Sequence, residues 1–207
     1  MGTKHRSTQW YQRHVNAGFV KRAQKEGKRS RAAFKLTEIL DKHGLELKPD
    51  AAVVDLGCAP GSWCEEIASR LGEAGLLIGI DLLPVVPVPG ATLLQVDFDS
   101  PEGLAAIEAA LAARPLSLVL SDMAPEMSGN KIVDQARMMH LNEMTLNFAV
   151  NHLKEGGHLL LKTFMGQGYD AFRRELSGWF RTVKAIKPEA SRKGSAEMFL
   201  LAMQFRR

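Results

Sequence analysis

The chain has 207 residues, a length that suits one domain or one domain with an extension. Its 45% hydrophobic and 24% charged residues are typical of a globular protein and exclude a mostly disordered chain. No apolar run approaches the ~20 residues that span a bilayer, and the basic N-terminus does not resemble a secretory signal. The two cysteines, Cys58 and Cys64, lack metal-site spacing. We therefore expect a cytoplasmic, metal-free protein with no membrane anchor, and nothing in the sequence demands more than a monomer.

The net charge of +4 is unevenly distributed. Residues 1–35 carry ten Lys and Arg against one acidic residue, residues 36–180 carry ten against twenty, and residues 181–207 carry seven against two. Basic segments at both ends of an acidic body favour a polyanionic partner. Four aromatic side chains interleave the first segment, where single-stranded bases could stack on them: Trp10, Tyr11, Phe19 and Phe34. Nucleic acid is the favoured partner, and a solvated arm that binds nothing is the alternative.

In chain order, residues 1–29 are predicted to form a basic N-terminal arm with a helix near 16–28, and residues 30–207 a second unit. Helices are expected over 31–43 with Ser30 as N-cap, 62–71, 101–113, 134–153 and 169–180. Strands are expected at 52–56, 76–80, 93–96, 116–120, 158–162, 182–186 and 198–205. The proline-rich stretch 84–89 and residues 122–130 should be loops. This alternation predicts an α/β fold with a mostly parallel sheet and helices on both faces.

Acidic residues mark the ends of four successive predicted strands. They are Asp55, Asp81, Asp97 and Asp122, and ligands of such sheets bind beyond the carboxyl ends of the strands. Each one alone could equally be a helix cap or a solvated turn residue. Together they disfavour a pyrophosphate cofactor and favour one with positive charge, such as S-adenosylmethionine.

The turn after the first strand contains Gly57 and Gly61. Glycines at a strand-to-helix turn let a ligand approach the backbone. Their spacing is not that of the G-x-G-x-x-G fingerprint, so a small-molecule dehydrogenase is weakly supported.

Lys162 closes the apolar run of residues 158–162, in a strand expected to be buried. Lysine is almost never fully buried unless it is paired. The residue therefore indicates an amine in a carboxylate-lined cleft, placed for proton transfer. The alternative is a lysine that extends past the strand end into solvent.

Six segments occur in an order that resembles the FtsJ/RrmJ family of ribose 2′-O-methyltransferases, from about residue 28 to the C-terminus. They begin at Ser30 (SRAAFKL), Asp55 (DLGCAPGSW), Asp81 (DLLP), Ser121 (SDMAP), Lys162 (KTF) and Lys187 (KPEASR). The resemblance implies the Rossmann-like fold of S-adenosylmethionine-dependent methyltransferases, with a seven-stranded sheet. It also implies S-adenosylmethionine as the methyl donor and no metal.

The family's Lys-Asp-Lys-Glu tetrad corresponds here to Lys35, Asp122, Lys162 and Glu197, with Lys162 as the general base. The resemblance places donor contacts at Gly61, Trp63, Asp81, Asp97 and Asp122, and we add Asp55 and Gly57 of the same motif. We predict RNA contacts at Lys28, Arg29, Arg31, Arg192 and Lys193. Two residues depart from the family pattern: Ser62 replaces a glycine, and Glu126 stands where asparagine is expected.

The expected activity is 2′-O-methylation of a uridine in large-subunit rRNA of the 23S type, in the assembled 50S subunit. A methyltransferase of tRNA or of an mRNA cap stays open, because those relatives share the tetrad. A non-catalytic RNA-binding ribosome-assembly factor also stays open, although an intact tetrad disfavours it. A base N-methyltransferase is disfavoured, because such enzymes more often carry Asn/Asp-Pro-Pro-aromatic after the fourth strand, and residues 122–125 are Asp-Met-Ala-Pro.

Overall fold

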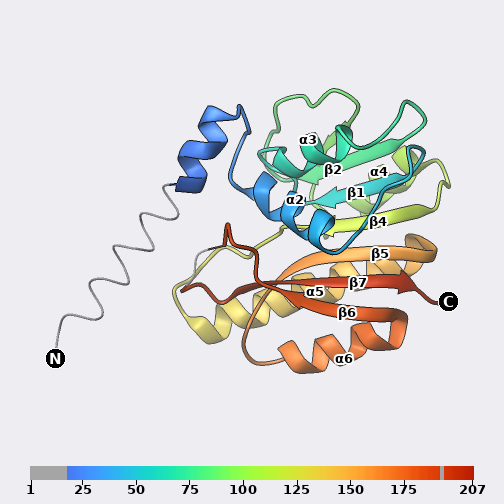
Figure 1. Cartoon of the computed structure of the whole chain (residues 1–207). Coiled ribbons are helices and arrows are strands. Elements are labelled where there is room, and N and C mark those ends of the chain that lie inside the picture. Colours follow the sequence, from blue (N-terminus) through green and yellow to red (C-terminus); the bar gives the residue numbers. More distant parts are fainter. Residues whose placement is uncertain (1–17, 192–193) are drawn as a thin grey trace.

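The computed structural model describes residues 18–191 and 194–207. Seven strands form one sheet of order β3-β2-β1-β4-β5-β7-β6 (Figure 1). The strands are β1 (Ala52–Leu56), β2 (Leu76–Asp81), β3 (Thr92–Gln95), β4 (Leu116–Ser121), β5 (Leu153–Phe164), β6 (Phe180–Ile186) and β7 (Glu197–Phe205). The pairs from β3 to β5 are all parallel, and β7 runs antiparallel to both β5 and β6. The predicted mostly parallel sheet is confirmed.

Helices cover both faces of this sheet (Figure 1). Apolar residues of α2 (Ala32–Lys42) and α3 (Ser62–Ala68) form one core cluster with the sheet. Residues of α4 (Pro101–Leu111), α5 (Lys131–His152) and α6 (Tyr169–Trp179) form the cluster on the other face. Side chains alternate along a strand, so Leu159 and Leu161 of β5 join the α4–α6 cluster and Leu160 joins the α2–α3 cluster.

The junction of α5 and β5 differs from the prediction. The Asn130 side chain accepts hydrogen bonds from the backbone N–H groups of Ile132 and Val133, so α5 begins three residues earlier than expected. The helix ends at His152, and residues 153–157 belong to β5 rather than to the helix end and a linker. Leu153 already pairs with β4, and an irregularity in the register follows it. At Leu153, pairing with β4 therefore determines the secondary structure, although the apolar periodicity of the sequence predicted a helix there.

The other end of β5 also extends beyond the prediction. The strand continues to Phe164, because residues 162–164 pair with the start of β7. Lys162 therefore lies inside the strand rather than at its end. α3 and α4 are shorter than expected, ending at Ala68 and Leu111.

A helix over residues 18–25 precedes α2 and lies within the predicted 16–28. The Phe19 ring lies 5.9 Å from the Phe34 ring of α2, and the Arg22 guanidinium lies 4.5 Å above Phe34. These two aromatic rings attach the helix to α2, whereas we expected them to be available for base stacking. Trp10 and Tyr11 lie outside the described residues.

Within the described residues, no helix is long and apolar enough to cross a membrane. The same part of the chain contains no group of three or more His, Cys, Asp or Glu side chains that could hold a metal ion.

Candidate active site

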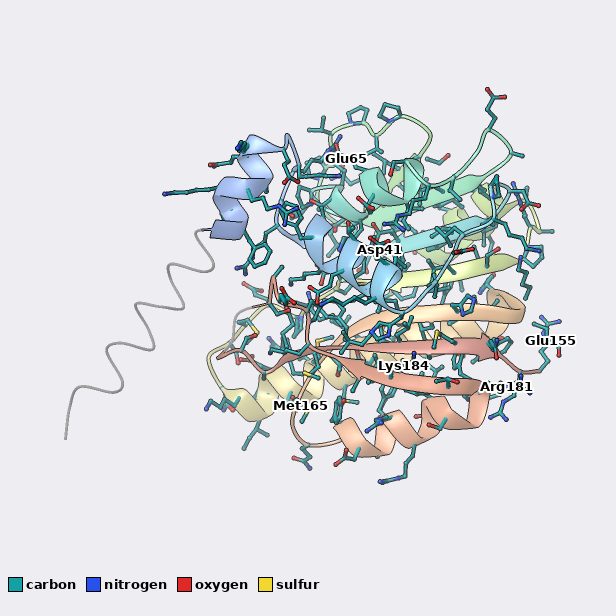
Figure 2. All side chains as sticks on the ribbon, viewed as in Figure 1. Asp41, Glu65, Glu155, Met165, Arg181 and Lys184 are labelled. Atoms are coloured by element: carbon teal, nitrogen blue, oxygen red, sulfur yellow. The ribbon has the colours of Figure 1, made fainter. Side chains whose placement is uncertain are left out.

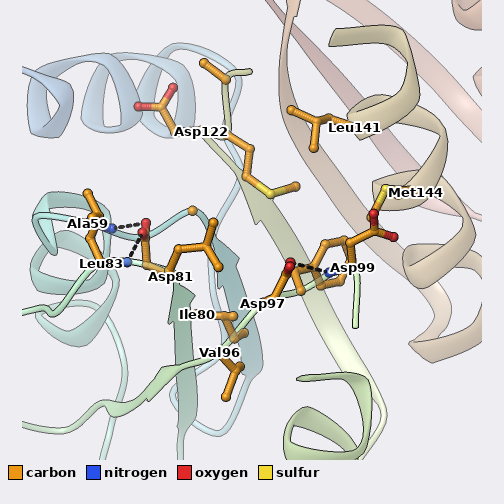
Figure 3. Close-up of a pocket in the computed structure, with 15 residues that line it drawn as sticks. Ala59, Ile80, Asp81, Leu83, Val96, Asp97, Asp99, Asp122, Leu141 and Met144 are labelled. Atoms are coloured by element: carbon orange, nitrogen blue, oxygen red, sulfur yellow. Dashed lines mark hydrogen bonds between the residues drawn. The ribbon is translucent and has the colours of Figure 1, made fainter. Parts of the chain in front are cut away.

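A cavity of about 340 Å³ lies at the carboxyl ends of β1 to β4, and we call it the strand-end cavity (Figure 3). Four carboxylates line it: Asp81, Asp97, Asp99 and Asp122. Its apolar lining includes Ile80, Val96, Phe98, Leu141 and Met144. The cavity thus offers hydrogen-bond acceptors and negative charge beside surfaces on which a flat apolar ring can pack.

Three of the predicted strand-end acids lie together at this cavity. Asp81 accepts hydrogen bonds from the backbone N–H groups of Ala59 and Leu83, both at 2.8 Å (Figure 3). Its carboxylate therefore ties the loop after β1 to the loop after β2. Asp97 follows β3 and accepts from the N–H of Asp99 at 3.0 Å. Asp122 follows β4 directly.

Asp55, the fourth predicted acid, is not at the cavity. It lies inside β1 with none of its surface exposed. Cys64 donates a hydrogen bond to its Oδ2 at 3.3 Å, and its Oδ1 has no partner. Burial, with smaller contributions from the charges of Asp122 and Asp81, raises the pKa of Asp55 to about 8. The Asp55 carboxyl group therefore contacts Cys64 of α3 in the interior, and it is not among the groups that line the cavity.

The turn after β1 carries the two predicted glycines. Gly57 lines the cavity with φ +74°, and a Cβ there would lie 2.5 Å from the side chain of Met123. Gly61 has φ +99° and directly precedes α3. Trp63 is buried, and its indole N–H donates to the Ala32 carbonyl at 2.9 Å. The Trp63 side chain thus packs behind the turn and does not line the cavity.

The four tetrad residues form two ion pairs. Lys162 Nζ lies 3.1 Å from Asp122 Oδ1 and donates a hydrogen bond to the Asp122 carbonyl. Lys35, on the buried face of α2, has its Nζ 2.8 Å from Glu197 Oε1. Both lysine side chains are less than a tenth exposed. α2, β4, β5 and β7 therefore each supply or directly precede one member of the tetrad.

The carboxylate of Glu197 is held in place from two sides. Besides Lys35, the Ser191 hydroxyl donates to Oε1 at 2.7 Å. Burial alone would raise the pKa of Glu197, but the charge and hydrogen bond of Lys35, with Ser191 and Lys162, hold that pKa below its ordinary value. Glu197 is therefore ionised at neutral pH, and it fixes the position of the Lys35 ammonium.

A second cavity, of about 400 Å³, lies beside these pairs, and we call it the lysine cavity. Lys162 and Glu197 line it together with Arg31, Ala124, Met127, Phe164, Ser195 and Ala196. Ala124 lines both cavities. The Lys162–Asp122 pair therefore joins them, since Asp122 lines the strand-end cavity and Lys162 lines the lysine cavity.

Of the residues predicted to contact RNA, two are paired with α3 and one lines the lysine cavity. Lys28 lies 3.3 Å from Glu66 of α3 and Arg29 lies 2.6 Å from Glu65, so both are paired within the fold. Arg31 lines the lysine cavity. Arg192 and Lys193 lie outside the described residues.

Met127 and Phe164 were not predicted as site residues. They lie in the loop after β4 and at the end of β5, and they line the lysine cavity. Met127 is 62% exposed despite its apolar side chain. The rule that ligands bind beyond the strand ends could have identified both residues.

The cavity chemistry fits S-adenosylmethionine. The apolar side chains suit an adenine ring, and the carboxylates suit ribose hydroxyls, an ammonium and a sulfonium. An acidic strand-end cavity joined to a buried lysine in this sheet defines an α/β methyltransferase.

Comparisons with known proteins identify the particular family. Residues 28–205 match the model of the FtsJ-like methyltransferases. The chain is 48% identical over 200 residues to ribosomal RNA large subunit methyltransferase E of Azoarcus sp. (strain BH72), covering 97% of both chains. It is 49% identical to the protein of that name from Halorhodospira halophila, covering 92% of this chain and 89% of the relative. The chain belongs to the FtsJ-like methyltransferase family, and its cofactor is S-adenosylmethionine, which the lining of the strand-end cavity fits.

Two solved structures of methyltransferases have a similar fold. A Plasmodium falciparum protein described as a ribosomal RNA methyltransferase matches with a TM-score of 0.76 at 30% identity, over 86% of this chain and 98% of that one. A Streptococcus mutans protein described as a methyltransferase, solved in complex with SAH, matches with a TM-score of 0.55 at 12% identity, over 83% and 97%. The second likeness concerns the fold alone.

Proposed function

We propose that this protein methylates the ribose 2′-hydroxyl of a uridine in large-subunit ribosomal RNA, within the assembled 50S subunit and in the cytoplasm. The names of the relatives at 47–49% identity support large-subunit rRNA as the substrate. The tetrad supports a hydroxyl as the acceptor, because a hydroxyl must lose a proton as it is methylated.

One observation carries the proposal: the Lys162–Asp122 pair stands where the two cavities meet. The strand-end cavity suits the methyl donor, and the lysine cavity is the space from which an acceptor can approach. An acceptor oxygen beside Lys162 would thus lie close to the donor's methyl group. Such alignment of reacting atoms is itself a large part of catalysis.

Bound S-adenosylmethionine supplies an electrophilic methyl group on a positively charged sulfur. In its neutral amine form, Lys162 would accept the proton of the 2′-hydroxyl as the bond between the oxygen and the methyl carbon forms. The bond from that carbon to sulfur would break at the same time, which leaves S-adenosylhomocysteine. A well-placed base typically contributes about 10²–10⁴-fold to the rate. Asp122 orients the Lys162 amine and adds negative charge beside the donor. Glu197 lines the lysine cavity, where it positions the Lys35 ammonium or the acceptor hydroxyl.

The walls of the lysine cavity suit a nucleoside. Met127 and Phe164 offer apolar surface, and nucleobases that are turned out of a helix pack on such side chains. The base is attached next to the 2′-carbon, so a base near these two residues leaves the hydroxyl near Lys162. Arg31 on the same lining suits an RNA phosphate.

The test is methyl transfer from labelled S-adenosylmethionine to three acceptors: 50S subunits that lack the modification, free large-subunit RNA and bulk tRNA. The product is mapped by nuclease digestion and by its resistance to alkali, since a 2′-O-methyl group blocks alkaline cleavage. We expect alkali-resistant label at a uridine, in 50S subunits and not in the free RNA.

Other outcomes would overturn parts of the proposal. Label in tRNA would keep the chemistry and change the substrate. Label that alkali releases as an unblocked nucleotide would indicate methylation of a base. Absence of label from every acceptor, with donor binding intact, would favour a non-catalytic assembly factor.

A further inference from the structure

Arg29 belongs to the basic segment predicted to bind RNA, yet its head group is used inside the fold. Its Nε donates to Glu65 Oε1 of α3 at 2.6 Å. Its Nη1 donates to the carbonyls of Pro60 and Val86 at 3.0 and 2.6 Å, and its Nη2 donates to the carbonyl of Pro87 at 2.8 Å. The side chain is only 17% exposed. Figure 2 labels Glu65 on α3, where the segment from the first helix to α2 passes.

The three carbonyls belong to the two loops that border the strand-end cavity. Pro60 lies in the turn after β1, next to Ala59, which lines that cavity. Val86 and Pro87 lie in the loop after β2, which begins with the lining residues Leu82 and Leu83. Arg29 therefore connects, through one planar group, two loops that themselves have no regular secondary structure.

A second link between the same loops lies inside the cavity. The Asp81 carboxylate accepts from the N–H groups of Ala59 and Leu83, one on each loop. Asp81 joins their N–H groups, and Arg29 joins their carbonyls. The loops that shape the strand-end cavity are thus fixed by one anion and one cation.

The packing around Arg29 is tight. A Cβ at Gly61 would lie 2.7 Å from Arg29 Nη1 and 3.0 Å from Val85 Cγ1. Together with its positive φ, this close approach leaves room only for glycine. Gly61, predicted as a donor contact, is not among the residues that line the strand-end cavity, and it makes room for the guanidinium.

We propose that Arg29 is a positioning residue for the methyl donor, which holds the loops after β1 and β2 in the geometry that binds S-adenosylmethionine. This deepens the proposed function on its donor side and does not depend on which RNA is the acceptor. The Glu65 carboxylate compensates the charge of Arg29, so Arg29 adds little to the field that attracts RNA. Lysine cannot replace it, because an ammonium lacks the planar fork that reaches several acceptors at once.

The experiment compares Arg29→Ala and Arg29→Lys with Lys25→Ala, which removes one positive charge from an exposed position of the same segment. The Kd for S-adenosylmethionine is measured by calorimetry without RNA, well below the melting temperature of each variant. RNA binding is measured separately as a function of salt. We expect both Arg29 variants to raise the donor Kd by about tenfold, the effect of losing a charge-assisted hydrogen bond. Lys25→Ala should leave the donor Kd unchanged.

Two results would overturn the assignment. If Arg29→Ala keeps the wild-type donor Kd and weakens RNA binding with a smaller salt dependence, Arg29 is an RNA phosphate contact. If Arg29→Ala lowers only the melting temperature and the folded protein binds the donor normally, Arg29 is a structural residue alone.

Glu65→Gln is a milder second variant in case Arg29→Ala does not fold. It keeps an acceptor for Nε and removes the charge, so we expect a smaller rise of the donor Kd; an unchanged Kd in this variant would contradict the proposal. These binding measurements contain no RNA. A failure to methylate rRNA would therefore overturn the proposed function but would not affect the proposed role of Arg29 in donor binding.

Discussion

The strand-end cavity and the lysine cavity are neighbours, but they are built differently. The strand-end cavity draws most of its lining from the end of β2 and from the segments that follow β1 to β4, and four carboxylates line it. The lysine cavity combines residues near positions 31, 124, 162 and 196, which are far apart in the sequence. Glu197 of this lining forms an ion pair with Lys35, which is also far from it in the sequence.

This difference suggests that donor binding and proton transfer can be disrupted separately. Changes in the strand-end cavity should act on the affinity for the methyl donor. Changes in the lysine cavity should act on the rate of transfer while the donor still binds. Substitutions at Lys162, Asp97 and Asp55 test this separation, and their effects on function should decrease in that order.

Lys162→Ala should have the largest effect. We expect the rate of methyl transfer to fall by about 10²–10⁴-fold, because the base is lost. The donor Kd should stay close to that of the wild type, since Lys162 does not line the strand-end cavity. Single-turnover transfer and calorimetric donor binding measure the two quantities.

Lys154→Ala is the matched control for this variant, because it removes an exposed lysine from the same strand. It should transfer methyl groups at the wild-type rate. Undiminished transfer by Lys162→Ala would remove Lys162 from the mechanism, and loss of donor binding in that variant would show that the two cavities act as one.

Asp97→Asn should have the opposite pattern. The variant keeps the size of the side chain and the acceptor for the Asp99 N–H, but removes one negative charge from the strand-end cavity. We expect the donor KM to rise by about tenfold, as for the loss of one charge-assisted hydrogen bond. The rate at saturating donor should change little.

Asp170→Asn, at the exposed start of α6, is the control and should not alter the donor KM. If Asp97→Asn lowers the saturated rate and leaves the donor KM unchanged, the assignment of Asp97 to donor binding is wrong.

Asp55→Asn should have the smallest effect on function and a distinct effect on stability. Burial raises the pKa of Asp55 to about 8, whereas the unfolded chain releases this proton near a pH of about 4. Its contribution to stability is complete below that lower pH and is lost as the pH rises towards 8, by at most about 1.4 kcal/mol per pH unit. Asparagine does not titrate, so the melting temperature of the variant minus that of the wild type should increase from pH 5 to pH 8.

The donor Kd of Asp55→Asn should equal that of the wild type, because Asp55 does not reach the strand-end cavity. A melting-temperature difference that stays constant with pH would mean that Asp55 is already ionised in the folded protein. A raised donor Kd would restore the sequence-based prediction that Asp55 contacts the donor.

The fold class and most of the strand-end cavity could be predicted from the sequence. Hydrophobic runs and turn residues are local signals, and parallel strands place the residues that follow them at one edge of the sheet. Asp81, Asp97 and Asp122 could therefore be assigned to one place from their position after a strand. The prediction for Asp55 did not follow this rule, because Asp55 lies one residue before the end of β1. Successive side chains of a strand point to opposite faces of the sheet, so a shift of one residue changes what a side chain contacts.

The pairing of charged side chains, in contrast, depends on contacts between elements that are distant in the sequence. Lys35 and Glu197 are separated by 162 positions, and their pairing depends on α2 packing beside β7. Resemblance to a family identified these two residues, but no local pattern joins them. The same holds for Arg29: its basic neighbours predicted an RNA contact, and packing against α3 directs its guanidinium to two loops instead. Local sequence fixes a residue's charge and secondary structure, whereas its partner depends on how distant elements pack.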